Sequence, residues 1–519
     1  AYQKAMQDTI NAIHGKTSVK INDGQDSDLY INDVSGYVLG YLADPGLNTT
    51  NVIATNKANP LYKYKGEYVS SGINSNPTES WLASISDEIY KYEQKVYKMQ
   101  HPVAITMIPE LDVLHHDKAG VNRIDDLATI DINNINISSK VKCGFFGAYN
   151  IFPDHPGFMA GETGKVKPGY TFYKQYMDKF MKTQKKYPVL VSEFGIPTNM
   201  GAARIKGLGY AKGENSEVIQ GQGIATMMNI IKNSGCMGGL IYEWADEWGS
   251  SGPSTASLMI PSERSNLWHN MIEPAQNYGI LALESPVPKD YSTTIKAVKP
   301  LQSIAYTADE SYLYIKSSFD KLPDFNKKSL LIYLDTIDKR KGEHMLTPNK
   351  NENWSGVEYE INIQNKNKAN LLVTPTYNTS KGSYYTSLTT TSIFENESTL
   401  VQGNFDDNIN NFYFEGTRLY IRIPWTQLNV TDPSSLLVLD DKKNKGTVNV
   451  IDKLRVRTTE GIVGSVIIKD KITKKIDYHF PKNIYDSGNR AFTWSTWEKP
   501  NYVSRNKKSY DIIKTILAP

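Results

Sequence analysis

Two acidic residues directly follow short apolar runs, a pattern that can place carboxylates where chemistry occurs. Glu193 follows the run 189–191 within YPVLVSEFG, and Glu243 follows the run 240–242 within GGLIYEWADEW. Each run has the length and composition of a buried strand. A carboxylate at the end of a buried strand is costly unless neighbouring groups use it or satisfy it. Both carboxylates are therefore candidate functional groups.

The segments around these acids predict a parallel sheet. Residues 217–233 lie between the two strands and have helical character. A strand, a helix and a second strand, with acids at the carboxyl ends of the strands, are typical of the active face of a β/α barrel. The same alternation runs through the first half of the chain and implies right-handed crossovers. Strands are predicted near 37–43, 102–107, 143–149, 188–192 and 238–242, and helices over 1–15, 79–99, with Thr78 as N-cap, and 170–186.

The composition changes after Pro286. Helical periodicity disappears, and short alternating runs such as SYLYIKSSF, LLIYLDT and RLYIRIPW take its place. Such runs, separated by turn residues, are typical of an all-β sandwich. We therefore predict an α/β barrel-type domain over 1–285 and a β-sandwich domain over 286–519. The chain closes with an aromatic-rich strand and a short helix.

Composition narrows the set of partners. The net charge of the 519 residues is only +3, and the basic residues are dispersed, which does not favour nucleic acid. No stretch is apolar enough to span a membrane. The 33 tyrosines and 8 tryptophans suit sugar stacking, although a biased genome composition would also explain the tyrosines.

Cysteine usage does not predict a disulfide or a metal site. Cys143 and Cys236 each stand at the head of a predicted strand, so buried free thiols are expected. No spacing of cysteine and histidine predicts a metal centre, and no cofactor is expected. Asp335 and Asp338 could suggest calcium, but carboxylates in turns are far commoner.

Several segments, taken in order, resemble one enzyme group. VLVSEFG resembles the seventh-strand nucleophile motif of clan A glycoside hydrolases, the barrel group that includes family 2. GGLIYEWADEW, followed by SNLWHNMIEPAQNYGILALES, resembles the eighth strand of a bacterial branch. GYVLGYLADPG, PVAITMIPELD and GFFGAYNIFPDHP resemble its fourth, fifth and sixth strands, so the likeness covers roughly 1–285. The later part faintly resembles the sandwich of DOMON and family 9 carbohydrate-binding modules.

The resemblance implies roles for individual residues. Glu193 would be the nucleophile, Tyr149 would hold it, and Trp244 would form the floor of the sugar site. The alternatives are that Glu193 only caps the turn at Gly195, that Tyr149 is core, and that the tryptophans only pack. Further substrate-binding residues would be Asn150, Glu243, Asp246 and Trp248.

The chain departs from the family pattern at the second catalytic acid. Retaining hydrolysis needs two carboxylates about 5–5.5 Å apart. The fourth strand should end in a glutamate, but Gly46 stands in its place. Asp44, two residues earlier, and Glu110, at the end of the fifth strand, are the candidate substitutes.

We therefore expect a retaining glycoside hydrolase acting on a polysaccharide or glycoconjugate, outside the cell or at its surface. The first alternative is a degenerate barrel that binds glycan or belongs to a surface assembly. The second is a structural or adhesive protein whose working part is the sandwich. A barrel of eight strands needs three more than the five predicted, and open sheets expose edge strands. We expect an earlier segment or a partner chain to cover that gap.

Overall fold

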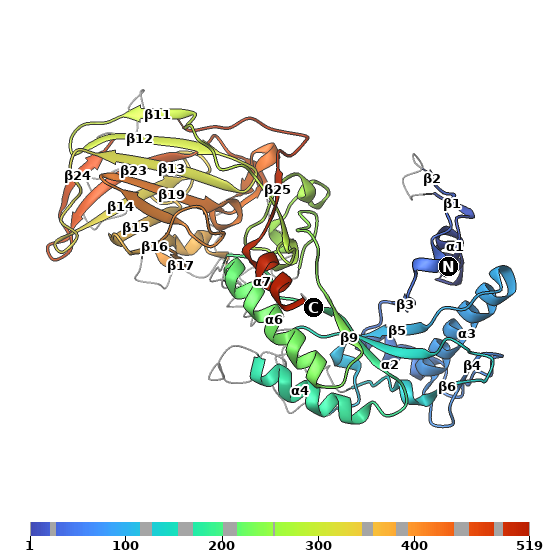
Figure 1. Cartoon of the computed structure of the whole chain (residues 1–519). Coiled ribbons are helices and arrows are strands. Elements are labelled where there is room, and N and C mark those ends of the chain that lie inside the picture. The colour runs from blue at the N-terminus through green and yellow to red at the C-terminus, as the bar shows by residue number, and fades with distance from the viewer. Residues whose placement is uncertain are drawn as a thin grey trace. The chain divides into compact units, whose positions relative to one another are not determined.

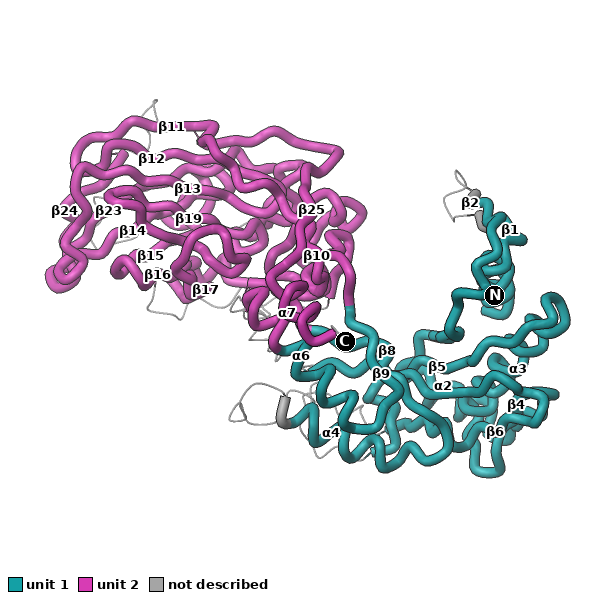
Figure 2. Tube along the Cα trace, viewed as in Figure 1, with its two compact units in different colours: residues 1–195, 223–242 teal, residues 196–222, 243–519 magenta. Residues whose placement is uncertain are grey.

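The computed structural model describes residues 2–20, 27–114, 127–153, 170–200, 215–252, 255–344, 356–379, 393–440, 456–481 and 491–517. The chain forms two compact units (Figure 2). Unit 1 comprises residues 1–195 and 223–242, and unit 2 comprises residues 196–222 and 243–519. The predicted domain boundary after residue 285 stays a prediction.

Unit 1 is built on the parallel sheet that the sequence predicts (Figure 1). Its five strands lie in the order β3-β5-β7-β8-β9, and all neighbours are parallel. Among the described residues β3 and β9 are the edges, so the sheet is confirmed but a closed barrel is not shown. The strands are β3 Tyr41–Ala43, β5 Val103–Met107, β7 Phe145–Asn150, β8 Val189–Phe194 and β9 Gly238–Ile241.

Helices connect these strands, as the alternation predicts. The helix after residue 76 begins two residues earlier than predicted, because Asn76 rather than Thr78 is its N-cap. The Asn76 side chain accepts a hydrogen bond from Glu79 N, and Glu79 accepts one from Asn76 N, each at 2.8 Å. The helices are α1 Tyr2–Ile13, α2 Thr49–Ala58, α3 Pro77–Tyr97, α4 Tyr170–Thr183 and α6 Glu217–Asn233; two small antiparallel pairs are β1 Thr17–Lys20 with β2 Ser27–Tyr30, and β4 Val69–Ser71 with β6 Ile135–Ile137.

A buried carboxylate anchors the start of β3, the strand that leads to Asp44. Glu93 of α3 accepts hydrogen bonds from the Tyr41 hydroxyl at 2.7 Å and from His101 N at 2.9 Å. Its carboxylate also contacts the rings of His101 and His14, at 2.5 and 3.3 Å. Four segments of the chain therefore meet at one carboxyl group, which fixes β3 relative to α3.

The two faces of the parallel sheet differ in how they are covered. Residues of one face pack against helices, as Tyr149 does against Phe180 of α4. On the other face, neighbouring strands carry Ala104, Phe146 and Ala148, with half-buried Leu190 beside them. Toward the edges of this face Leu42 and Leu240 are 41% and 49% exposed.

Unit 2 contains two antiparallel sheets that share one hydrophobic core. Residues such as Ile304 and Ile315 from the first sheet pack with Ile332 and Ile361 from the second. The first sheet is β11 Thr293–Lys296, β12 Leu301–Ala308, β13 Tyr312–Phe319, β19 Arg418–Pro424 and β18 Phe412–Glu415; the second is β17 Glu395–Leu400, β16 Lys368–Val373, β15 Tyr359–Asn365, β14 Lys328–Asp335, β23 Val463–Asp470 and β24 Ile476–Phe480; a small third sheet is β20 Val430–Asp432, β21 Leu437–Leu439 and β22 Val456–Thr458.

The end of the chain returns to the segments that precede the sandwich. Strand β25 Val503–Asn506 pairs antiparallel with β10 Leu281–Glu284. Helix α7, Lys508–Leu517, follows at once, and its Ser509 hydroxyl donates to Gln220 Oε1 at 2.6 Å. A Cβ added at Gly221 would lie 2.8 Å from Ser509 Cα, so the glycine permits this close approach.

A buried acid in the second sheet makes stability depend on pH. Burial raises the pKa of Glu360 in β15 from 4.5 to about 7, although Asn362 donates to its carboxylate at 2.8 Å. Between these values the folded state binds more protons than the unfolded state, so stability falls as the pH rises through this window.

We therefore expect Glu360→Gln to stabilise the protein above about pH 7, by on the order of 1–3 kcal/mol, and to have little effect near pH 4.5. Urea unfolding of both proteins across this range measures the difference. Exposed Glu415→Gln is the control. An equal effect of Glu360→Gln at all pH values would contradict the prediction.

Candidate functional site

Glu193 lies near the end of β8, half-buried and held by a neighbouring amide. The pairing of β7 and β8 shifts register after Tyr149, which places Asn150 opposite Glu193. The Ser192 hydroxyl donates to Asn150 Oδ1 at 2.8 Å, and the Asn150 side chain hydrogen-bonds the Glu193 carboxylate. Because the Asn150 oxygen accepts from Ser192, its amide hydrogens are available to Glu193.

The environment of Glu193 raises its pKa. Burial raises the pKa of Glu193, the charge of Asp44 raises it further, and the hydrogen bond from Asn150 opposes both. Asp44 directly follows β3, which β5 and β7 separate from β8. In a flat sheet the two strands would lie about 14 Å apart. The charge of Asp44 thus acts on Glu193 although β5 and β7 lie between their strands.

Gly46 occupies a turn that suits glycine. Asp44 Oδ1 accepts a hydrogen bond from Gly46 N at 2.8 Å, and the φ angle of Gly46 is +61°. A Cβ at Gly46 would meet no atom within 4 Å. The space is open, but the left-handed backbone disfavours any side chain there. The expected fourth-strand glutamate is thus replaced by a tight turn that presents Asp44.

The structure places Tyr149 in the core and Glu110 in a separate turn. Tyr149 is buried, and its ring lies 4.6 Å from that of Phe180 in an edge-on contact. Burial raises its pKa well above the usual value. Tyr149 therefore faces α4, whereas the next residue, Asn150, contacts Glu193. Glu110 is half-buried in the single turn Pro109–Leu111 after β5.

The predicted residues after β9 belong to unit 2, and their environments differ. Trp248 is buried, donates to Leu283 O at 2.9 Å and stacks on His269 at 5.2 Å. Trp244 is 63% exposed, with its ring 6.4 Å from Tyr510. The structure thus gives Trp248 a packing role and leaves the Trp244 ring accessible.

Glu243 has the properties of a proton donor. It is half-buried, and burial followed by the charges of Glu247 and Asp246 raises its pKa to about 8. Lys507 lowers this pKa but does not offset the other effects. A carboxyl group with that pKa is mostly protonated at neutral pH and can act as a general acid.

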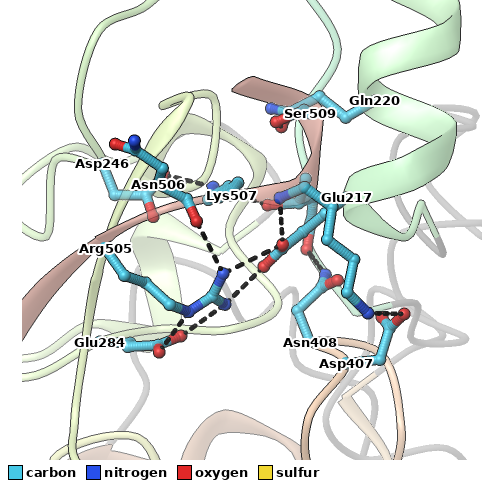
Figure 3. Close-up of polar contacts among 12 residues, drawn as sticks. Glu217, Gln220, Asp246, Glu284, Asp407, Asn408, Arg505, Asn506, Lys507 and Ser509 are labelled. Atoms are coloured by element: carbon cyan, nitrogen blue, oxygen red, sulfur yellow. Dashed lines mark hydrogen bonds and ion pairs between the residues drawn. The ribbon is translucent and has the colours of Figure 1, made fainter. Parts of the chain in front are cut away.

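Sequence reasoning missed a cluster of ion pairs built by the C-terminal segment (Figure 3). Lys507 Nζ lies 2.7 Å from Asp246 Oδ1, with both side chains buried, and donates to Thr198 Oγ1 at 2.8 Å. Arg505 bridges Glu217 at 2.5 Å and Glu284 at 2.6 Å. The partners are separated by more than 200 residues, so local patterns carried no signal of these contacts.

Other predictions concern metals, cysteines and membranes. In the described ranges, no group of three or more histidines, cysteines and acids could hold a metal ion. Asp338 instead contacts Arg457 at 2.6 Å. Cys143 and Cys236 are free thiols, half-buried rather than fully buried. A search of the described helices finds none long and apolar enough to cross a membrane.

Comparisons with known proteins add little to this geometry. No protein-family model matches the sequence, and no curated protein matches it. Among solved structures, the chain is weakly similar to a β-glucuronidase from Ruminococcus gnavus determined in complex with D-glucuronic acid. The TM-score is 0.24 and the identity 11%, over 39% of this chain and 27% of that one. A likeness this weak assigns no activity, so function must be argued from the site.

Proposed function

We propose that the chain is a retaining glycoside hydrolase acting on a polysaccharide or glycoconjugate, with Glu193 as nucleophile and Asp44 as the second carboxylate. The observation that carries the proposal is that Glu193, near the end of β8, and Asp44, directly after β3, lie at the carboxyl end of the same parallel sheet. That end of such a sheet is where catalytic side chains collect. A pair of facing carboxylates is the chemical requirement of retaining hydrolysis.

Each member of the pair has a distinct task. The pair reacts when it holds a single proton, on Asp44: ionised Glu193 attacks the anomeric carbon and forms a glycosyl ester, while Asp44 gives that proton to the leaving oxygen. Asp44 then removes a proton from water, which attacks the ester and restores both carboxyl groups. Asn150 positions the Glu193 carboxylate through its amide. The roles predicted for Glu110, Tyr149, Glu243, Trp244, Asp246 and Trp248 stay predictions.

A covalent trap tests the nucleophile directly. The full chain is incubated with a panel of activated fluorosugars, whose glycosyl esters hydrolyse slowly, and the digested protein is analysed by mass spectrometry. We expect one glycosyl group on the peptide that contains Glu193. Glu67→Gln, at an exposed acid of unit 1 paired with Lys140, should label as the wild type does. An ester on another carboxylate would contradict the assignment.

A second candidate function is glycan binding without hydrolysis, in the cell-surface or extracellular setting proposed for this chain. The observation that favours it is the glycine turn at Gly46, because a missing general acid would slow that step about 10²–10⁴-fold. Saturable binding to a glycan array, weakened by Trp244→Ala and without turnover of any bound glycan, would favour this function over hydrolysis.

Two exposed leucines in the edge strands support a proposal about partners. Leu42 of β3 and Leu240 of β9 are 41% and 49% exposed, and among the described residues these two strands are the edges of the sheet. Unpaired parallel edges with apolar neighbours are normally covered in native proteins. We propose that further strands, from a longer form of this chain or from a partner, pair with these edges. The mass of the protein complex isolated from its natural source would show whether the chain is longer or carries a bound partner.

A further inference from the structure

A buried glutamate of unit 1 contacts a histidine ring whose other nitrogen faces a backbone carbonyl. Glu93 Oε1 lies 2.5 Å from His101 Nδ1, and Ser35 O lies 3.0 Å from His101 Nε2. A carbonyl oxygen can only accept, so Nε2 carries a proton. Two lone pairs would repel each other across the short contact of Nδ1 with Oε1, so a second proton lies between these atoms. The arrangement therefore holds one proton more than a neutral histidine beside an ionised glutamate.

The donors around the carboxylate place this proton on the histidine. The Tyr41 hydroxyl donates to Glu93 Oε1 at 2.7 Å, and His101 N donates to Oε2 at 2.9 Å. Burial, together with the hydrogen bond to Glu93, raises the pKa of Tyr41 well above its usual range, so this hydroxyl keeps its proton. Donors on both oxygens favour the ionised carboxylate. The shared proton therefore lies on Nδ1, and His101 is an imidazolium.

Further titratable groups near this pair come from neighbouring segments. His14, directly after α1, lies 3.3 Å from Glu93 Oε1 through Nε2 and 3.7 Å from Asp33 Oδ2 through Nδ1. Hydrogen bonds from Ser35 lower the pKa of Asp33, so this acid is ionised at neutral pH. The other groups are Tyr97, whose ring stacks on His14 at 3.7 Å, Lys16 over the Tyr97 ring, and Tyr90 and Cys143, which sense the charge of Glu93. Because His14 is a second histidine at the same carboxylate, both rings have to be followed in a titration.

Loss of the extra proton would cost the ring its contact with Ser35. A neutral imidazole has one N–H, and the His101 ring faces two acceptors. The carboxylate is the stronger acceptor, so the remaining proton stays on Nδ1 and the Nε2 lone pair faces Ser35 O. Ser35 is the only buried residue of the described segment 31–40, in which Tyr37 and Leu39 are 88% and 94% exposed. The contact with His101 therefore fixes the one buried point of this segment.

We propose that His101 and Glu93 form a pH-sensitive switch, in which the protonated ring holds the segment 33–40 and loss of one proton as the pH rises releases it. The segment leads directly into β3, which begins at Tyr41. The proposal goes beyond the hydrolase function, because neither Glu193 nor Asp44 takes part in the proton exchange.

Two measurements on the full chain test the proposal at about pH 5.5 and about pH 9, on either side of the range in which histidines usually titrate. Ring nitrogen NMR of the isotope-labelled protein follows the protons on His101 and His14. Hydrogen exchange, corrected for its intrinsic dependence on pH, follows the segment 33–40. The amides of Val34, Tyr37 and Val38 are hydrogen-bonded there and report its release.

One variant should abolish the pH dependence without removing the contacts. In Glu93→Gln the side-chain amide can donate to Nδ1 of a neutral His101 ring, which leaves Nε2–H on Ser35 O at both pH values. The matched control is Glu88→Gln, at an acid of the same helix α3 that contacts α1 through Gln7 at 3.3 Å.

In the wild type we expect protons on both ring nitrogens of His101 at the lower pH and on one at the higher pH. Exchange in the segment 33–40 should then be faster by about tenfold or more, the effect of losing one hydrogen bond from a charged donor. The amides of β5 should not respond, which distinguishes release of the segment from unfolding. The segment should stay protected at both pH values in Glu93→Gln, and Glu88→Gln should behave as the wild type does.

The wild-type readings decide the matter even where Glu93→Gln does not fold. A His101 ring that holds the same number of protons at both pH values would overturn the proposal. Equal exchange of the segment 33–40 at both pH values would do the same, as would a Glu93→Gln variant that keeps the pH dependence of the wild type.

Discussion

Glu193→Gln is expected to lower turnover of a responsive glycan by at least about 10²-fold, the lower end of the range for losing a catalytic carboxyl group. Glutamine keeps the size of the side chain and can still contact Asn150, so the fold should survive. It cannot form the glycosyl ester, because the amide is a poor nucleophile. The measurement is the initial rate on whichever glycan or aryl glycoside the wild type cleaves.

The Asp44→Asn variant separates the roles of the two acids. The Asp44 charge raises the pKa of Glu193, so its removal should lower that pKa. On an aryl glycoside with an easily lost leaving group, protonation by Asp44 matters little for the first step. The residual activity should then show its acid limb at lower pH than the wild type, because Glu193 ionises more readily.

Two results would contradict this account. Unchanged turnover by Glu193→Gln would exclude Glu193 as nucleophile. An acid limb that stays in place in Asp44→Asn would mean that Asp44 does not sense Glu193, and the second carboxylate would have to be sought elsewhere, first at Glu110. Glu67→Gln, at an exposed carboxylate of the same unit, should match the wild type in both rate and pH profile.

The sequence predicted the five parallel strands because each contains a short apolar run. The strand predicted at 37–43 is shorter in the structure, because residues 35–37 form a helical turn and β3 begins at Tyr41. The sequence missed α2, whose residues 49–58 carry few apolar side chains and show no amphipathic pattern. Strand alternation puts Tyr149 and Asn150 on opposite faces. The sequence could not show that Asn150 rather than Tyr149 meets Glu193, because the register shift between β7 and β8 depends on strand pairing rather than on composition. The types of residue near Glu193 could therefore be predicted from the sequence, but the contacts of their side chains could not.

Contacts between residues far apart in the chain could not be predicted from the sequence. For the segment 503–517 the sequence predicted only a strand and a short helix. In the structure, Arg505 and Lys507 of this segment form ion pairs with acids more than 200 residues earlier. Asp246 was predicted as a sugar ligand from its place after β9. Its observed ion pair with Lys507 explains why this acid is buried.

Lys507→Met is accordingly expected to be the most destabilising single change in unit 2, costing about 3–5 kcal/mol. Methionine fills a similar volume but leaves the buried Asp246 carboxylate without its cation and Thr198 Oγ1 without its donor. Urea unfolding measures the loss, and limited proteolysis shows whether the segment 503–517 is released. Lys514→Met, at an exposed lysine of helix α7, which follows Lys507, is the control and should cost little.

The cost should depend on pH and on Asp246. Burial already raises the pKa of Asp246 to about 6 with Lys507 in place, and removal of the cation should raise it further. Protonation of Asp246 at acid pH then relieves the unpaired charge, so the cost of Lys507→Met should shrink well below pH 6. The double variant Lys507→Met with Asp246→Asn should recover part of the lost stability above that pH, since no buried charge remains. A loss that is equal at all pH values, or unaffected by Asp246→Asn, would mean that packing rather than the ion pair holds the C-terminal segment in unit 2.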